Sequence, residues 1–262
     1  MKKIGIIGCG NLGMSIVKGV VEKDTDVSII ASKRNLSSLE NHDLGQTVLT
    51  TDNKEVIENS EILIVALKPY NIISVLNEYK DLIDPSIHTV VSVASEISIK
   101  EIKSAVPEGV GVYRAMPNTA ASVGESVTLY CYDEDPLERE QGIVEVFSTI
   151  GETLKIEESL MESATILGAC GVAYVLRFMR AMIQGGIEVG FDAKTATSIV
   201  AQTMKGASEL VIQNGSHPEQ EIDKVTTPKG CTIVGLNEME HAGFSSALIK
   251  GIVTSYKKIE TV

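Results

Sequence analysis

The sequence predicts an α/β protein with an N-terminal Rossmann-type doubly wound sheet and a C-terminal all-α dimerisation domain. Short apolar runs alternate with segments of helical spacing through about the first 150 residues. A G-x-G-x-x-G pattern separates the first apolar run from the first helical segment, and after residue 156 no run resembles a strand. Strands that alternate with helices form βαβ units, and these build a mostly parallel sheet covered by helices on both faces.

The expected strands are short and rich in Ile and Val. They cover residues 4–7, 27–31, 47–50, 62–67, 89–93, 110–115 and 127–132, of which 47–50 has the weakest pattern. The run 62–67 is apolar throughout, which is typical of a strand buried on both faces. Helical spacing between the strands predicts helices at 12–21, 53–59, 71–83 and 98–106.

Helical spacing alone continues to the C-terminus. It predicts helices at 157–165, 171–189, 193–214 and 232–256. We therefore expect two domains, residues 1–155 and 156–262. The later helices have wide apolar faces, for example Leu176, Met179 and Ile183. Such faces pack either on the N-terminal domain or against a second chain, and we favour a homodimer formed through the C-terminal helices.

Composition excludes several classes of function. There are 23 basic and 35 acidic residues, a net charge of −12, so we expect no nucleic-acid partner. The four cysteines form no CxxC pair, and we expect a reduced, cytoplasmic protein without a metal site. The apolar N-terminal stretch is interrupted by glycines and lacks a signal cleavage site. The uncharged run 163–176 is too short to span a bilayer, so we interpret it as a buried helix and expect no membrane contact.

The glycine pattern predicts a dinucleotide site. Gly8-Cys9-Gly10-Asn11-Leu12-Gly13 directly follows a strand and opens a helix. In this context Gly8 permits a tight turn, Gly10 lets a pyrophosphate approach the backbone, and Gly13 allows close packing of helix on strand. The start of the helix supplies free N–H donors and a partial positive charge to the pyrophosphate. A glycine-rich turn without a cofactor is the alternative.

The end of the second strand favours NADP over NAD. An NAD site usually places an acidic residue there, which bonds the ribose 2′-hydroxyl. This sequence instead has Ser32, Lys33 and Arg34, side chains that suit a 2′-phosphate. We expect NADPH as the cofactor, with NADH a weaker one. The alternative is that the two basic residues belong to a solvated loop.

Two further loops follow strands of the expected sheet. Ala66, Lys68 and Pro69 come after one strand, and Ala94 comes after the next. Ligands of doubly wound sheets lie beyond the carboxyl ends of the strands, so both loops are candidates for the cofactor site. The spacing does not distinguish a phosphate-binding Lys68 from an ordinary exposed lysine.

A loop near the C-terminus has the pattern of an anion-binding helix start. Thr227 and Pro228 resemble an N-cap and first helical residue, and Gly230, Cys231 and Thr232 follow. The N–H groups there could hold a carboxylate. The alternative is a capped helix without a ligand. No pattern supports Cys231 as a nucleophile.

Together these segments resemble the pyrroline-5-carboxylate reductase family. The matching segments are residues 6–13 and 66–69, the Arg-Ala-Met-Pro-Asn-Thr sequence at 114–119, residues 171–174, and residues 223–236 with the Met-Glu pair at 239–240. The Met-Pro-Asn-Thr segment and the long C-terminal segment are the most diagnostic. The resemblance implies a Rossmann domain, a helical domain that joins two chains, and larger rings of dimers in some members.

The resemblance also implies a reaction and a set of site residues. The reaction is the NADPH-dependent reduction of 1-pyrroline-5-carboxylate to L-proline. The residues implied at the cofactor are Gly8, Gly10, Asn11, Leu12, Gly13, Ser32, Lys33, Arg34, Asn53 (beside the adenosine), Ala66, Lys68, Pro69, Ala94 and Asn118. The residues implied at the substrate are Thr227, Gly230, Cys231 and Thr232. Thr232 would bond the imine nitrogen and is the expected catalytic residue.

Three departures from the family pattern concern the substrate and the rate. Glu96 and Lys229 stand where the family usually has glycine, and the stretch 168–173 is altered. A reductase for another cyclic imine and a catalytically silent NADPH-binding regulator are therefore the alternatives. A 3-hydroxyacid dehydrogenase would need a lysine on the helix 171–190, and none is present.

Overall fold

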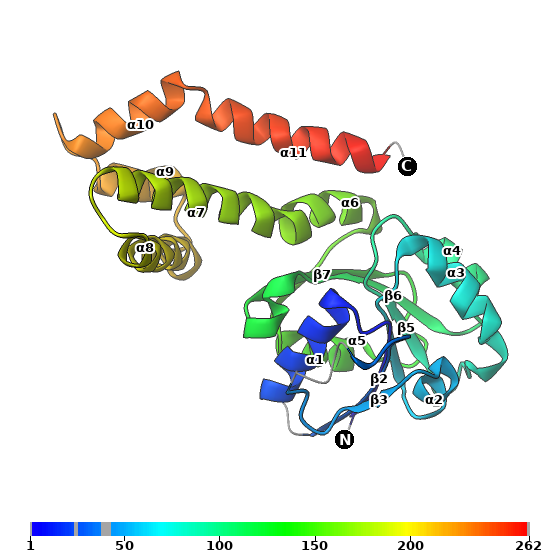
Figure 1. The fold of residues 1–262 in the computed structure, drawn as a ribbon. Coiled ribbons are helices and arrows are strands. Elements are labelled where there is room, and N and C mark those ends of the chain that lie inside the picture. Colours follow the sequence, from blue (N-terminus) through cyan, green and yellow to red (C-terminus); the bar gives the residue numbers. More distant parts are fainter. Residues whose placement is uncertain (1, 24–25, 38–42, 261–262) are drawn as a thin grey trace. The chain divides into compact units, whose positions relative to one another are not determined.

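The structure is a computed structural model that describes residues 2–23, 26–37 and 43–260. The chain divides into two compact units (Figure 1). Unit 1 comprises residues 1–172 and 258–262, and unit 2 comprises residues 173–257. The predicted α/β and all-α parts are therefore both present. The sheet ends at Lys155, while the compact units divide after Val172, so the predicted boundary at 155/156 stays a prediction.

Unit 1 is built on one sheet, with eight strands among the described residues. They are β1 (Lys2–Ile7), β2 (Val27–Ser32), β3 (Val48–Thr50), β4 (Ile62–Val65), β5 (Thr89–Ser92), β6 (Gly111–Met116), β7 (Ser126–Tyr132) and β8 (Gly151–Lys155). Their order is β3-β2-β1-β4-β5-β6-β7-β8, and every pair is parallel except the antiparallel pair β6–β7. The sheet is therefore mostly parallel, as predicted. The order of the strands reverses at β1, because β2 and β3 lie on one side of it and β4 and β5 on the other. Doubly wound sheets bind ligands at such a point.

Helices cover both faces of this sheet (Figure 1). On one face lie α1 (Asn11–Lys23) and α5 (Glu140–Ser148), and on the other lie α2 (Asn53–Glu58), α3 (Pro69–Glu78) and α4 (Ile99–Ser104). Strand β4 shows how both faces fill, because Ile64 packs in one core cluster while Leu63 and Val65 pack in the other. The prediction of a strand buried on both faces is confirmed. Short 3₁₀ helices are η2 (Lys80–Leu82), η3 (Thr119–Val123) and η4 (Glu158–Leu160).

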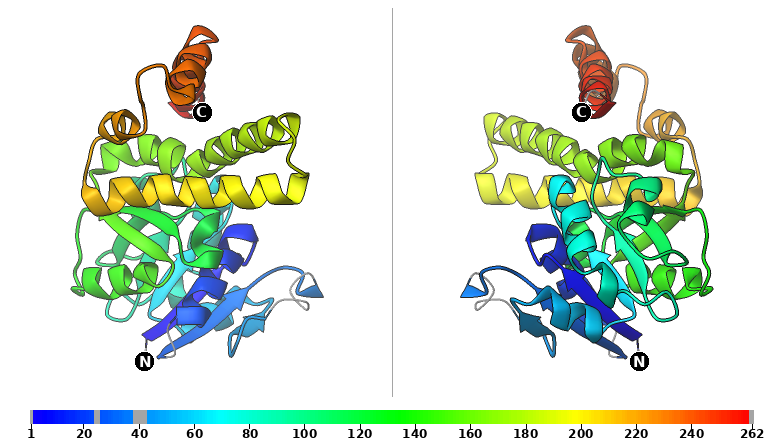
Figure 2. Two further views of the ribbon diagram at one scale, coloured as in Figure 1. Left: turned by 90° about the vertical axis from the view of Figure 1, so that its left-hand side faces the viewer. Right: turned by 90° about the vertical axis from the view of Figure 1, so that its right-hand side faces the viewer.

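The rest of the chain is helical among the described residues. The elements are α6 (Met161–Ala164), the π-helical η5 (Thr165–Cys170), α7 (Gly171–Glu188), α8 (Ala193–Asn214), α9 (Pro218–Lys224), α10 (Cys231–His241) and α11 (Phe244–Glu260). The N-cap of helix α8 (yellow in Figure 2) is Asp192, whose carboxylate accepts hydrogen bonds from the N–H groups of Lys194 and Thr195. Its C-cap is Gly215, which has a φ of 60°. Both ends thus have standard caps, which explains why its predicted bounds are confirmed.

Some predictions of elements are wrong. Residues 232–256 do not form one helix, because the chain turns at Ala242 and Gly243, where Gly243 has a φ of 81°. Residues 157–165 and 171–189 do not form separate helices, because η5 joins α6 to α7 without a break. Helices α5 and α9 and strand β8 were not predicted from the sequence. Strand β8 reads Gly-Glu-Thr-Leu-Lys, and it escaped detection because an edge strand needs no continuous apolar run.

One helix among the described residues, Glu158–Glu188, is long and apolar enough to cross a membrane by length and composition. Only 17% of its most apolar window is buried within the chain. The interpretation of 163–176 as a buried helix is therefore not confirmed within a single chain, and the expectation of no membrane contact stays a prediction. In α7 the buried side chain is that of Ile183, while Leu176 is 55% exposed.

Candidate functional site

The glycine loop between β1 and α1 has the geometry that its sequence predicts. Gly8 has a φ of 97°, and a Cβ there would lie 2.8 Å from the carbonyl oxygen of Ala66. A Cβ on Gly13 would lie 2.7 Å from the carbonyl oxygen of Gly8, so the helix packs directly on the turn. A Cβ on Gly10 would meet nothing within 4 Å. Gly8 and Gly13 are thus required by internal packing, whereas Gly10 faces space that a ligand can use.

The end of β2 meets this loop. The carbonyl oxygen of Ser32 accepts hydrogen bonds from the N–H groups of Cys9 (2.7 Å) and Gly8 (3.2 Å). The Ser32 hydroxyl donates to Oδ1 of Asn53, the first residue of α2, at 2.6 Å. The structure therefore brings together the glycine loop, Ser32 and Asn53, which are far apart in the sequence. The next two residues after Ser32 lie closer to the surface: Lys33 is half-buried and Arg34 is exposed.

The loops after β4 and β5 lie at the same edge of the sheet as the glycine loop. The N–H of Ala66 donates to the carbonyl oxygen of Ile7 at 2.8 Å, so the chain leaves β4 beside the end of β1. Lys68 is the exposed N-cap of α3 and Pro69 its first residue. Ala94 is buried two residues beyond β5. Because β1, β4 and β5 are adjacent and parallel, all three loops emerge at their carboxyl ends.

Asn118 differs from the other predicted cofactor residues because its amide is already occupied. Its Oδ1 accepts from the N–H of Ala120 at 2.9 Å, and its Nδ2 donates to the carbonyl oxygen of Gly168 at 3.0 Å. The side chain is buried and caps η3. These contacts give Asn118 a structural role, and its predicted contact with the cofactor stays a prediction.

In unit 2 the predicted substrate loop is a tight turn followed by a helix start. The N–H of Gly230 donates to the carbonyl oxygen of Thr227 at 2.9 Å, which closes a turn over Pro228 and Lys229. A Cβ on Gly230 would lie 2.5 Å from Oγ1 of Thr227, so the turn requires glycine there. Helix α10 begins at Cys231, and its N-cap is Gly230, which provides no side-chain cap. Its first N–H groups are therefore available to an anion, and Thr232 lies in the same turn of helix. The prediction of Thr227 as N-cap and Pro228 as first helical residue is wrong, because these residues belong to the turn that precedes the helix.

The two departures from the family glycines share one backbone conformation. Glu96, in the loop after β5, has a φ of 64°, and Lys229 has a φ of 60°. Side chains disfavour this left-handed region by about 1–2 kcal/mol, which explains why glycine suits both positions. The chain thus keeps the backbone that glycine would adopt and carries a charged side chain at each position.

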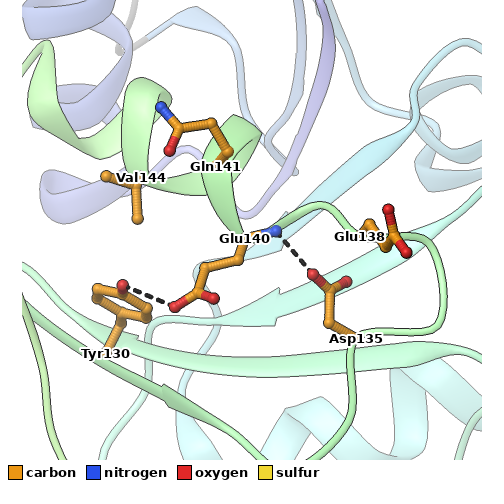
Figure 3. A pocket seen from close by; sticks show the side chains of 6 residues that line it. All are labelled: Tyr130, Asp135, Glu138, Glu140, Gln141 and Val144. Carbon is orange, nitrogen blue, oxygen red and sulfur yellow. Dashed lines mark hydrogen bonds between the residues drawn. The ribbon is translucent and has the colours of Figure 1, made fainter.

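A cavity of about 550 Å³ lies over β7 and α5 in unit 1, and none of the residues described above lines it (Figure 3). Its lining residues are Tyr130, Asp135, Glu138, Glu140, Gln141 and Val144. Glu140 accepts a hydrogen bond from the Tyr130 hydroxyl at 3.0 Å, and its N–H donates to Asp135 at 2.8 Å. The hydroxyl of Tyr132, together with Lys155, holds the pKa of Glu140 below its usual range. Three carboxylates around this cavity disfavour a phosphate-rich ligand.

One charged cluster of unit 1 was not predicted from the sequence. Arg114, in the middle of the buried strand β6, is 3% exposed and pairs with Glu158 and Glu162. An arginine inside an apolar strand was the available signal, because a buried guanidinium requires partners. Its partners lie 44 and 48 residues away, so sequence spacing could not identify them.

Comparison of this chain with known proteins identifies its family. A family model described as "Pyrroline-5-carboxylate reductase dimerisation" matches residues 158–262, and one described as "NADP oxidoreductase coenzyme F420-dependent" matches residues 3–96. Pyrroline-5-carboxylate reductase 2 of Dictyostelium discoideum is 40% identical over 98% of this chain and 92% of its own length. The chain belongs to the pyrroline-5-carboxylate reductase family.

Two other similar proteins agree with this assignment. Pyrroline-5-carboxylate reductase 1 of D. discoideum is 41% identical over 97% of this chain, which spans 49% of that longer protein. A crystal structure of 1-pyrroline-5-carboxylate reductase from Streptococcus pyogenes is 26% identical, with a TM-score of 0.87 over 99% of this chain and 98% of the other. The family and fold class predicted from the sequence are therefore confirmed.

Proposed function

We propose that this chain carries out its family's reaction with the residues described above. It is an NADP-dependent oxidoreductase that reduces the C=N bond of 1-pyrroline-5-carboxylate to give L-proline, the last step of proline biosynthesis. The geometric observation that supports this most directly is the junction of the glycine loop with Ser32 and Asn53. This junction forms a binding surface for a dinucleotide. At the end that would face the ribose, the protein presents the Ser32 hydroxyl and the Asn53 amide, and β2 contributes no carboxylate.

The residues of unit 1 fit NADPH. Gly8, Gly10, Asn11, Leu12 and Gly13 would hold the pyrophosphate, because Gly10 is open and α1 starts with unpaired N–H groups. Ser32, Lys33 and Arg34 would hold the 2′-phosphate, with Asn53 beside the adenosine. Ala66, Lys68, Pro69, Ala94 and Asn118 would complete the site. The cofactor supplies the hydride, and the protein supplies binding and orientation.

In unit 2 the start of α10 would hold the substrate. N–H groups after Gly230 would bind the carboxylate together with Thr227 and Cys231, and the Thr232 hydroxyl would bond the imine nitrogen. A protonated imine is a strong electrophile, so most of the acceleration can come from positioning. Threonine is a weak acid, and we assign Thr232 an orienting role in proton delivery from water.

The test of the reaction is an assay with purified protein, NADPH and 1-pyrroline-5-carboxylate, followed at 340 nm. We expect NADPH oxidation with stoichiometric L-proline. Bound NADPH without proline would support either the silent regulator or a reductase for another cyclic imine, and a panel of cyclic imines separates those two. Absence of NADPH binding would refute both the reaction and the cofactor assignment.

Two substitutions test the residue assignments. Thr232→Ala should lower kcat/KM by about tenfold to a hundredfold, because a hydrogen bond to a charged group contributes about 1.5–3 kcal/mol. Thr232→Ser is the matched control, since it keeps the hydroxyl and should retain most activity. An unchanged kcat/KM in Thr232→Ala would show that Thr232 is not in the substrate site.

Arg34→Ala should reduce the preference for NADPH over NADH by about tenfold to a hundredfold by the same argument. An unchanged NADPH preference in Arg34→Ala would show that Arg34 does not bind the 2′-phosphate.

The assembly is also part of the proposal. A dimerisation model matches 158–262, and these residues include the helices whose apolar side chains stay exposed in one chain. We propose that they form a homodimer, with larger oligomers built from it, and that the apolar helix Glu158–Glu188 packs against protein and not lipid. The domain boundary at 155/156, the absence of nucleic-acid and membrane partners, and the cytoplasmic location stay predictions.

A further inference from the structure

We propose that Arg114 and Glu158 are positioning residues for the loop between β5 and α4, which carries Ala94. This inference rests on the proposed function, because Ala94 is assigned to the path towards the nicotinamide. It assigns a role to a buried ion-pair cluster whose residues have no part in the binding scheme above.

The cluster begins beside the last residue of β5. Arg114 on β6 pairs in register with Ser92, the end of β5. Its guanidinium lies 3.3 Å from Glu158 and 2.9 Å from Glu162. The Arg114 side chain is 4% exposed, while the two carboxylates are 38% and 26% exposed. A cation buried this deeply fixes its partners, because separating them would leave the charge unpaired.

The two carboxylates differ in their hydrogen bonds to the loop. Oε1 of Glu158 accepts a second hydrogen bond, at 2.7 Å, from the N–H of Ile99, the first residue of α4. Glu162 lies in the same pocket as Glu96, Ile97 and Ser98 of the loop, but its Oε2 has no hydrogen-bond partner among the described residues. Glu158 therefore links Arg114 to the end of the loop by hydrogen bonds, whereas the hydrogen bond of Glu162 is to Arg114.

The loop is fixed at both ends and strained between them. Val93 and Ala94 are buried at its start, and Ile97 is buried at its end. Glu96, between them, is exposed and has a φ of 64°. A segment held in a disfavoured conformation keeps it only while its surroundings impose it. The bond from Ile99 to Glu158 is one such constraint, since it pins the residue at which the loop becomes helix.

The contrast between the two glutamates provides matched variants. Glu158→Ala and Glu162→Ala each remove one carboxylate from Arg114, but only the first frees Ile99. We expect both to lower the Tm by similar amounts. Glu158→Ala should also lower kcat by on the order of tenfold to a hundredfold, as expected when reacting groups are misplaced by about an ångström, with little change in the KM for NADPH.

Two further variants separate positioning from stability. Glu158→Gln keeps an oxygen that can accept from Ile99 and should recover most of the kcat lost in Glu158→Ala. Lys103→Met removes a surface ion pair of α4 with Asp133 and should leave kcat unchanged. Equal kcat values for Glu158→Ala and Glu162→Ala, or failure of Glu158→Gln to recover activity, would overturn the proposal.

Hydrogen exchange separates failure of this inference from failure of the proposed reaction. The amide of Ile99 should exchange faster in Glu158→Ala than in Glu162→Ala, whether or not the protein reduces 1-pyrroline-5-carboxylate. Equal exchange in the two variants would overturn the positioning role. An inactive wild-type protein with the expected exchange difference would instead refute only the reaction.

Discussion

The two units of this chain differ in how much of their apolar surface they bury on their own. Unit 1 encloses two core clusters, one on each face of the sheet, with many side chains fully buried. The core cluster of unit 2 consists of Ile183, Ala196 and Val200, with three partly buried methionines around it. Exposed large side chains of unit 2 include Ile212 (73%), Ile249 (62%) and Val234 (65%).

This difference indicates that the two units are completed by different means. A sheet with helices on both faces buries both faces within one chain. A few helices without a sheet leave much of their apolar surface uncovered, and contiguous exposed apolar surface marks an interaction site. A dimerisation model matches 158–262, and in the proposed homodimer a second copy of the chain would cover this surface.

The largest effect is expected in the core of unit 1. Ile64 is fully buried in β4, so Ile64→Ala should lower the free energy of unfolding by about 2–5 kcal/mol through lost burial and a cavity. Ile87 of the same unit is 44% exposed, so Ile87→Ala provides the matched control. It should lower the free energy of unfolding by less than about 1 kcal/mol. Chemical denaturation measures both. Similar losses would contradict the description of unit 1 as closed within one chain.

A charge on the helices of unit 2 should affect assembly more than folding. Ile249→Glu on α11 should weaken self-association at least about tenfold, because an interface core excludes unpaired charge. Val48→Glu on β3, at a position 50% exposed in unit 1, should leave the oligomeric state unchanged. Analytical ultracentrifugation distinguishes these outcomes. A dimer unaffected by Ile249→Glu would show that this part of α11 lies outside the interface.

A smaller effect should be shared by the two units. Glu96 in unit 1 and Lys229 in unit 2 both have left-handed backbones. Glu96→Gly and Lys229→Gly should each raise the free energy of unfolding by about 0.5–1 kcal/mol, which is the relief of strain less the added entropy of the unfolded chain. Lys229→Ala is the control, since it removes the charge and keeps the strain. Loss of stability in the glycine variants would show that the side chains make compensating contacts.

Thiol labelling should distinguish the buried cysteines of unit 1, Cys9 and Cys131, from the exposed Cys231 of unit 2. Burial raises the pKa of Cys131 to about 11 and also raises that of Cys9, both in unit 1. At pH 8 about one Cys131 thiol in a thousand is ionised, and access is blocked as well. Iodoacetamide should therefore label exposed Cys231 in the native protein, and Cys9 and Cys131 only after unfolding. Rapid native labelling of Cys131, read by mass spectrometry, would indicate that β7 opens.

Predictions from the sequence are confirmed where a structural requirement is local. The turn at Gly8, the helix that follows the glycine loop and the apolar strand β4 each depend on a few consecutive residues. The same holds for the bounds of α8, Ala193–Asn214, which the caps at Asp192 and Gly215 explain. The function predicted from the glycine pattern agrees with the structure. A Cβ on Gly10 would meet nothing within 4 Å, whereas Gly8 and Gly13 are tightly packed.

Predictions from the sequence are wrong or incomplete where pairing across the chain decides the structure. Strand β8 is polar, and it is a strand because β7 offers it hydrogen-bond partners at the edge of the sheet. The break at Gly243 is set by one φ angle inside a continuous helical pattern. The Ser32–Asn53 contact was not predicted as a contact, although both residues were assigned to the cofactor.

The sequence by itself determined the alternation of strands and helices up to β7, the family and the residue types at the cofactor and substrate loops, because these depend on short-range patterns and on matching motifs. Only the tertiary structure decided which carboxylate paired with Arg114 is hydrogen-bonded to the end of the loop after β5, which glycines are packed and which is open, and which apolar helices stay uncovered in one chain. The physical reason is that hydrogen bonds and burial join residues that are distant along the chain, and spacing along the sequence carries no information on those distances.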